Sequence, residues 1–115
     1  MNHDPSCIFC KIVAGQIPSR KVFEDDEMLV FHDIAPWAPV HLLMIPKEHV
    51  RSMVEIEPRH APLLGRLLAM APGLMRDLGV TNGFRTLINT GEDGRQEVQH
   101  LHVHVMGGPR PWAKG

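Results

Sequence analysis

The stretch QHLHVHV at residues 99–105 constrains the fold more than any other part of this chain, because histidine and aliphatic residues alternate in it strictly. Successive side chains of a β-strand point to opposite faces, so a period of two indicates a strand. We therefore predict a strand over residues 98–106. Its aliphatic side chains would face the core: Leu101, Val103 and Val105. Its imidazoles would share the other face, with neighbouring Cα atoms roughly 6.5–7 Å apart: His100, His102 and His104.

The remaining apolar patterns predict four further strands and two helices. We expect the strands at residues 21–24, 28–33, 40–46 and 84–88. A short helix over residues 7–14 should end at Gly15. The one long helical candidate covers residues 58–78, where apolar side chains recur at three- and four-residue steps, and Pro72 should kink or locally break it. This order of elements indicates an α+β fold with a mostly antiparallel sheet.

Length and composition place the chain among ordinary globular domains. Its 115 residues fit a single domain, 1–115, with a loose N-terminal tail at residues 1–6. The net charge of −1 offers no electrostatic argument for nucleic acid or an anionic membrane as a partner. No apolar run approaches the roughly 18 residues of a membrane span, and the N-terminus lacks the pattern of a signal peptide. We therefore expect a cytoplasmic protein.

The two cysteines lie three residues apart, in the order Cys7-Ile8-Phe9-Cys10. A disulfide between them would close a very small loop and constrain little of the chain. In a cytosolic protein this spacing indicates a redox pair or half of a zinc site. A redox pair of the thioredoxin kind should follow a strand, and no strand precedes these cysteines. The pattern therefore favours metal binding.

The histidine row is compatible with three interpretations. It could be an exposed polar face that happens to carry histidine. It could be a three-histidine metal site, which would need further ligands on neighbouring strands. It could also serve nucleophilic catalysis, since imidazole titrates near neutral pH and acts as nucleophile, acid or base.

Longer motifs make the catalytic interpretation specific. QHLHVHVMGG resembles the signature of the histidine triad family of nucleotide hydrolases and transferases. CIFCKIVAGQIPS, VFEDD, LVFHDIAPWAPVHLLMIPKEH and LINTGEDGRQEVQHLHVHVMGG follow that family in order, so the resemblance covers nearly the whole chain, from Cys7 to about Trp112. The Gly107-Gly108 ending is similar to the Hint branch, the nucleoside phosphoramidases, and less similar to the diadenosine-polyphosphate branch.

The resemblance implies a catalytic role for four histidines: His41, His100, His102 and His104. In the family pattern the middle histidine of the triad, His102, attacks the α-phosphorus of a nucleoside phosphoramidate and expels the amine. Water then cleaves the covalent nucleotidyl-histidine, and no metal is required for this chemistry. His104 would contact the phosphate, and His41 would lie beside the triad.

The resemblance also implies a purine nucleotide site for AMP, GMP and their phosphoramidates. Asp33 would accept the ribose hydroxyls, and Asn89 and Gln96 would hold the phosphate or the leaving group. The full set of implied nucleotide-binding residues is Phe9, Phe31, Asp33, Ile34, Leu43, Asn89, Gln96, Glu97, Val98, His102 and His104. Two positions depart from relatives: Arg95 replaces a common glycine, and Glu97 replaces the serine of animal Hint proteins.

Some bacterial family members hold a structural Zn²⁺ with two cysteines and two histidines. The resemblance implies that the matching ligands here are Cys7, Cys10, His49 and His100. Two sulfurs and two nitrogens suit tetrahedral zinc, and such a closed site stabilises the fold without taking part in catalysis. Two other histidines, His32 and His60, are expected at the surface.

The family pattern further implies a homodimer in which two five-stranded sheets form one ten-stranded sheet. The C-terminal tail, residues 109–115, would then lie near the active site of the partner. The expected activity is hydrolysis of a purine nucleoside phosphoramidate. A dinucleoside polyphosphate hydrolase of the same fold, a nucleotide-binding regulatory module and a metal-dependent enzyme using the three triad histidines as ligands are the alternatives.

Overall fold

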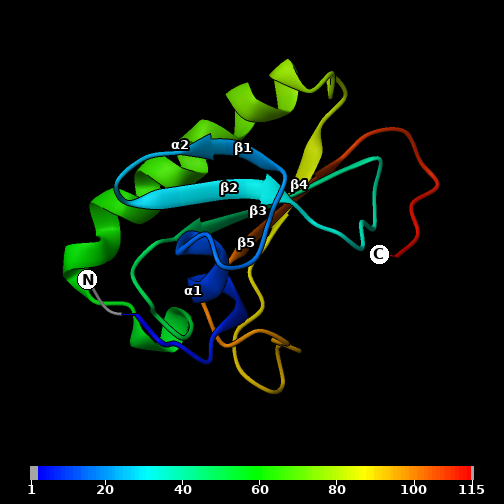
Figure 1. The fold of residues 1–115 in the computed structure, drawn as a ribbon. Helices are drawn as coiled ribbons and strands as arrows, with labels where there is room; N and C mark the ends of the chain where they lie inside the picture. Colours follow the sequence, from blue (N-terminus) through cyan, green and yellow to red (C-terminus); the bar gives the residue numbers. More distant parts are fainter. Residues whose placement is uncertain (1–2, 115) are drawn as a thin grey trace.

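The computed structural model describes residues 3–114, which form one five-stranded sheet with a helix against each face (Figure 1). The elements in chain order are α1 (Ile8–Val13), β1 (Lys21–Glu24), β2 (Met28–His32), β3 (Val40–Pro46), two 3₁₀ turns (Met53–Glu55 and Pro58–His60), α2 (Ala61–Asp77), β4 (Phe84–Leu87) and β5 (Val103–Gly107). The strand order is β1-β2-β3-β5-β4, and every neighbouring pair is antiparallel. The predicted α+β fold and antiparallel sheet are confirmed.

Strand alternation divides the core into two layers, one on each face of the sheet. Met28 and Val30 of β2, with Val103 and Val105 of β5, pack in the layer that contains α2. The intervening positions on the strands face α1, and their cluster with that helix consists of Cys7, Phe9, Cys10, Ile12, Leu29, Phe31, Leu43 and Ile45. Side chains of chemical interest therefore collect on the α1 face wherever they occupy these intervening positions.

The long helix α2 begins after a capping box and passes through an internal proline. The side chains and backbones of Glu57 and His60 exchange hydrogen bonds before the first turn. Pro72 does not break the helix, which continues to Asp77. Both Pro72 and Leu68, one turn earlier, are exposed residues. No helix within residues 3–114 is both long and apolar enough to span a membrane.

The last strand is shorter than predicted and begins only at Val103. The segment before it makes other hydrogen bonds: the Leu101 N–H donates to the Val50 carbonyl at 2.7 Å, and the Gln96 amide donates to the Val98 carbonyl at 2.9 Å. Leu101 is still buried, as expected, and so are Val103 and Val105. Alternation therefore predicted the burial of this segment correctly but overestimated the length of the strand.

Candidate active site

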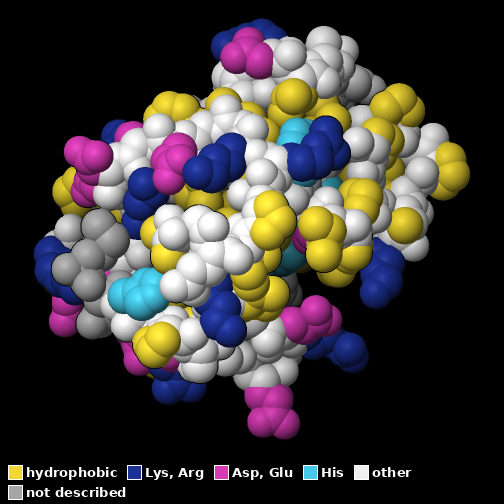
Figure 2. Space-filling view, viewed as in Figure 1, with side chains coloured by type: hydrophobic (Ala, Val, Ile, Leu, Met, Phe, Trp, Pro, Cys, Tyr) yellow, Lys and Arg dark blue, Asp and Glu magenta, His cyan; other side chains and the backbone are white. Residues whose placement is uncertain are grey.

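A cavity of about 590 Å³ opens on the α1 face of the sheet. Figure 2 shows hydrophobic side chains grouped around a hollow with histidine atoms at its base. Ten of the eleven nucleotide-binding residues predicted from the sequence line this cavity: Phe9, Phe31, Asp33, Ile34, Leu43, Asn89, Glu97, Val98, His102 and His104. Apolar residues from α1, β2 and β3 line one part of it, and the histidines line another. Such a cavity suits a ligand with an apolar ring and a polar end.

Strand register explains why residues far apart in the sequence meet here. Leu43 of β3 pairs with His104 of β5, so these two side chains are neighbours on the α1 face. His41 lies two residues before Leu43 and points to the same face, where it is buried. The tight segment before β5 adds His102, whose ring centroid lies 4.9 Å from that of His104.

The orientation of His102 leaves one ring nitrogen available to a ligand. Its Nδ1 lies 2.7 Å from the carbonyl oxygen of His100. A carbonyl can only accept, so Nδ1 carries the proton and, in the neutral ring, Nε2 keeps its lone pair. The ring of Phe9 packs edge-on against the His102 ring, with the centroids 5.2 Å apart. These contacts fix the tautomer and the ring position that a nucleophilic imidazole requires.

The neighbouring His104 presents the opposite chemistry because of a relay that begins at the backbone. The N–H of Trp37 donates to Nδ1 of His41 at 3.0 Å. The neutral His41 ring then carries its proton on Nε2, which lies 2.8 Å from Nδ1 of His104. Since Nδ1 of His104 accepts, its Nε2 carries a proton and can donate to a ligand. Two adjacent imidazoles therefore supply a lone pair and a donor.

Burial keeps these rings neutral at physiological pH. Loss of solvation lowers the pKa of His104 to about 4, and repulsion from His102 and His41 acts in the same direction. Burial also lowers the pKa of His102, outweighing its hydrogen bond to the His100 carbonyl, and the pKa of His41, outweighing the attraction of Asp33. The Asp33 carboxylate lies 3.5 Å from Nε2 of His41.

The loop after β4 is held in shape largely by two residues that were expected to contact ligand. Gln96 is buried and absent from the cavity lining: its amide accepts from Gly91 N–H at 3.0 Å and donates to the Arg51 carbonyl at 2.6 Å. The structure therefore places Gln96 inside the loop, and its contact with a ligand stays a prediction. Asn89 lines the cavity and also donates to the Gly94 carbonyl at 2.7 Å.

A second group of side chains meets behind the nucleophile. The two sulfurs of Cys7 and Cys10 and the Nδ1 atoms of His49 and His100 all lie within 4.8 Å of one another. The measured sulfur–nitrogen distances are 3.3 to 3.6 Å, and the two nitrogens are 3.3 Å apart. Ligands at ordinary zinc bond lengths, arranged tetrahedrally, lie roughly 3.3–3.6 Å apart for these atom pairs. The donor set therefore fits Zn²⁺.

The surroundings orient these donors as a metal site requires. Nε2 of His100 donates to the Pro46 carbonyl at 2.8 Å, which leaves the Nδ1 lone pair directed at the sulfurs. The N–H of Cys10 donates to the sulfur of Cys7 at 3.3 Å, and the N–H of Asp4 donates to the sulfur of Cys10 at 3.4 Å. Cys7 also forms the N-cap of α1, so the donor set anchors that helix.

Comparisons with known proteins show the family of this chain. Residues 6–113 match the family model described as "Scavenger mRNA decapping enzyme C-term binding". A histidine triad protein from Clostridium difficile superposes with a TM-score of 0.89 at 40% identity, covering 95% of this chain and 96% of that one. This chain belongs to the histidine triad family. A HIT family hydrolase from Legionella pneumophila superposes with a TM-score of 0.88 at 41% identity, covering 96% and 100% of the two chains.

Sequence relatives place this histidine triad protein in the Hint-like branch. Protein HitA of Neisseria gonorrhoeae is 54% identical over 104 residues, which is 90% of this chain and 97% of that protein. Adenylylsulfatase HINT1 of Arabidopsis thaliana is 47% identical over 107 residues, 91% of this chain and 73% of that protein. The 14 kDa zinc-binding protein of Brassica juncea is 47% identical over 103 residues, 88% and 91% of the two chains.

Three residues that line the histidine triad cavity were missed or left without a role by sequence reasoning: Trp37, Arg95 and Lys114. The Trp37 ring stacks on His104 with an interplanar angle of 19° and centroids 5.9 Å apart. Its position between two prolines is the signal in the sequence, because a rigid segment can hold an aromatic ring in place. Arg95 has a φ of 60°, which is uncommon for a residue other than glycine.

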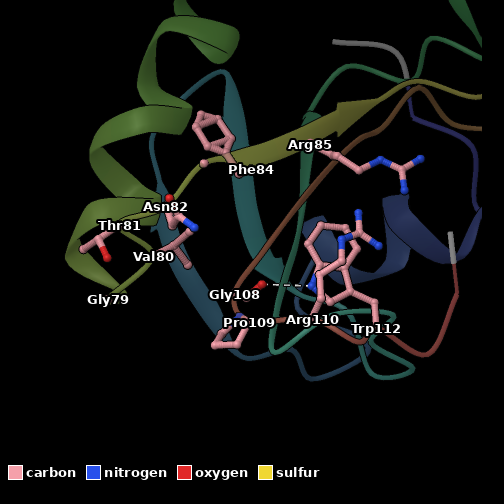
Figure 3. A pocket seen from close by; sticks show the side chains of 11 residues that line it. Gly79, Val80, Thr81, Asn82, Phe84, Arg85, Gly108, Pro109, Arg110 and Trp112 are labelled. Atoms are coloured by element: carbon pink, nitrogen blue, oxygen red, sulfur yellow. Dashed lines mark hydrogen bonds between the residues drawn. The ribbon is translucent and has the colours of Figure 1, made fainter.

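The C-terminal segment of this histidine triad protein runs alongside its own Trp37 loop. The N–H of Ala113 donates to the Trp37 carbonyl at 2.7 Å. A second cavity of about 590 Å³ lies where this segment meets the loop after α2, and Figure 3 shows Arg110 over the ring of Trp112 beside it. The lining of this second cavity contains no histidine and no carboxylate among the described residues, so it lacks the groups that the first cavity offers for catalysis. A position of the tail near a partner's active site stays a prediction.

Two of the remaining histidines differ from each other. His60 was expected at the surface but is buried, and its Nδ1 accepts from the Glu57 N–H at 2.9 Å in the capping box of the 3₁₀ turn that precedes α2. His32 is half-buried at the end of β2 and lines the active-site cavity. Burial lowers the pKa of His32, and the nearby charge of Arg20 adds to this effect.

Proposed function

We propose that this protein hydrolyses the P–N bond of purine nucleoside phosphoramidates through a covalent nucleotide on His102. Nε2 of His102 attacks the phosphorus, the P–N bond to the amine breaks, and the amine leaves after taking a proton from water. A water molecule then attacks the same phosphorus, which releases the nucleoside monophosphate and regenerates the neutral imidazole.

The observation that carries this proposal is the pair of fixed tautomers. His102 offers a lone pair because its Nδ1 donates to the His100 carbonyl, while His104 offers an N–H because its Nδ1 accepts from His41. A nucleophile beside a donor is what phosphoryl attack requires, since negative charge accumulates on the phosphoryl oxygens. An exposed polar row does not describe these rings, because His100 is fully buried and His102 is 5% exposed.

The cavity supports a nucleotide as the substrate. Phe9, Phe31 and Leu43 supply an apolar wall for a base, and Asp33 supplies acceptors for ribose hydroxyls. The histidine pair lines the same cavity, so its lining offers matching groups for a base, a ribose and a phosphate. The similarity to a plant protein named for hydrolysis of an adenylyl compound points to the same class of substrate.

We also propose that Cys7, Cys10, His49 and His100 hold a structural Zn²⁺. The donor distances fit the metal, and the chain is similar to a plant zinc-binding protein. The ion stabilises the fold by linking the start of α1 to the loop after β3 and the segment before β5. Because all four donors are protein side chains, the site has no open position for substrate, and catalysis takes place at the histidines of the cavity.

The decisive experiment traps the intermediate. The purified protein is mixed with an adenosine phosphoramidate, quenched in the presteady state and digested, and the adenylylated peptide is sequenced by mass spectrometry. We expect the adduct on His102, and an adduct on His104 or His41 would overturn the mechanism. Parallel assays with adenosine 5′-phosphoramidate, an AMP–lysine amide and diadenosine polyphosphates separate this activity from that of a dinucleoside polyphosphate hydrolase.

We further propose that two copies pair into one ten-stranded sheet. The strand β4 pairs only with β5 among the described strands, so its other edge is open. The helix α2 also exposes Leu68, which is 43% accessible, and its C-cap residue Leu78 is 37% accessible. Covering a strand edge and an apolar helix face in a symmetric contact removes both from water. Sedimentation equilibrium of the purified chain should give twice the monomer mass, and a monomer at all concentrations would contradict the pairing.

A further inference from the structure

We infer that metal binding at Cys7, Cys10, His49 and His100 and nucleotide binding in the cavity reinforce each other through Phe9. This inference rests on the function and the zinc site proposed above and adds a coupling between them. Two sites are coupled when each ligand favours the same arrangement of a shared element. The shared element here is the short helix α1, which takes part in both sites.

The helix α1 depends on the metal donors for its position. It has only six residues, and a helix this short has little stability of its own. Cys7 caps its first turn and Cys10 lies in its first full turn, and both sulfurs point at the two imidazoles. A bound ion holds this end of α1 against the loop after β3. Without an ion, apolar packing and the weaker sulfur–imidazole hydrogen bonds hold it in place.

Phe9 links the position of α1 to the active site. It lies between the two cysteines in the sequence, is 6% exposed, and lines the nucleotide cavity. Its ring packs edge-on against His102 at 5.2 Å and against Phe31 at 5.7 Å, measured between centroids. A shift of α1 therefore moves one wall of the base site and one support of the nucleophile together.

A second contact joins the two sites through His100. Its ring supplies one of the proposed metal donors, and its backbone carbonyl accepts the Nδ1 proton of His102 at 2.7 Å. Holding the His100 ring also holds the peptide that sets the tautomer of His102. A nucleotide that packs against Phe9 and His102 stabilises the same arrangement from the cavity side. Linkage then requires that the nucleotide raise metal affinity by the factor by which the metal raises nucleotide affinity.

The test measures loss of Zn²⁺ from the loaded protein, a quantity that does not depend on catalysis. Zinc transfer to a chromophoric chelator is followed with and without saturating AMP. We expect AMP to slow the transfer by about fivefold or more. Calorimetry on loaded and metal-stripped protein should show a matching loss of AMP affinity. Equal transfer rates with and without AMP, together with equal AMP affinities, would overturn the coupling while leaving the zinc site and nucleotide site intact.

Two matched variants test the route through Phe9. Phe9→Leu keeps an apolar side chain but removes the ring contact with His102 and part of the wall for the base, so AMP should bind more weakly. At AMP concentrations that saturate the variant, AMP should slow zinc transfer less than about twofold. Phe23→Leu makes the same chemical change in the opposite core layer and should retain the full effect of AMP. Full slowing in Phe9→Leu would exclude Phe9 as the link. A wild-type protein that takes up no Zn²⁺ would overturn the proposed metal site and the coupling together.

Discussion

The two histidine clusters use the same side chain for opposite purposes. In the active-site cluster, donors and acceptors alternate from Trp37 through His41 to His104, so each hydrogen bond satisfies the next ring. In the second cluster, the Nδ1 atoms of His49 and His100 lie 3.3 Å apart, and both point toward two sulfurs. A chain of alternating hydrogen-bond donors and acceptors needs no ion, whereas four converging lone pairs favour a cation. The partner of the other ring nitrogen decides which chemistry an imidazole performs.

The largest effect is expected at the nucleophile of the first cluster. His102→Ala should lower turnover of an adenosine phosphoramidate by about 10³-fold or more and abolish the covalent adduct, because it removes the lone pair that attacks the phosphorus. AMP binding should persist. His3→Ala is the matched control, since it removes an exposed histidine that is absent from the cavity lining. Substantial turnover in His102→Ala would show that another group attacks the phosphorus.

Loss of a donor from the second cluster should lower the stability of the fold far more than it lowers the turnover number. Cys10→Ser removes one metal donor, and we expect it to lower the Tm by about 10 °C or more relative to the zinc-loaded wild type. The turnover number measured well below the Tm should fall far less than in His102→Ala. Thermal melts with added Zn²⁺ or chelator measure the difference. An unchanged Tm on chelation of the wild type would argue against a structural ion.

Disrupting the hydrogen bonds from Trp37 through His41 to His104 should have an intermediate effect on catalysis. His41→Ala removes the donor to Nδ1 of His104, so that ring can adopt the other tautomer and lose its N–H toward the phosphate. We expect kcat to fall by about 100-fold. His41→Gln restores an N–H donor at this place and should recover part of the loss, which a merely steric role of His41 would not predict. Equal losses in both variants would contradict the relay.

The sequence predicted the fold and the members of both clusters because local pattern and motif order determine them. Period-two alternation correctly assigned the buried side chains of β5, and the spacing of Cys7 and Cys10 pointed toward a metal. The tautomers of the histidines could not be predicted from the sequence, since they depend on which carbonyl or N–H the fold brings to each ring. Gln96 shows the same limit: its three amide hydrogen bonds reach backbone groups at Gly91, Arg51 and Val98, and only the folded loop reveals them.

The smallest expected effect is a change of stability with pH, which tests whether the histidines of the active-site cluster are neutral in the folded protein. The pKa of His104 is about 4 in the folded protein, against 6.5 for an unburied histidine, and burial lowers that of His41 in the same direction. Below pH 6.5 the unfolded chain therefore binds more protons than the folded one, so stability falls as pH drops from about 6.5 toward 4. Urea unfolding of wild type and of His104→Gln at several pH values measures this effect, because any loss of Zn²⁺ at low pH acts on both proteins alike. His104→Gln should show a shallower loss than wild type over that window, and an identical slope would mean that His104 is protonated as readily in the folded protein as in the unfolded chain.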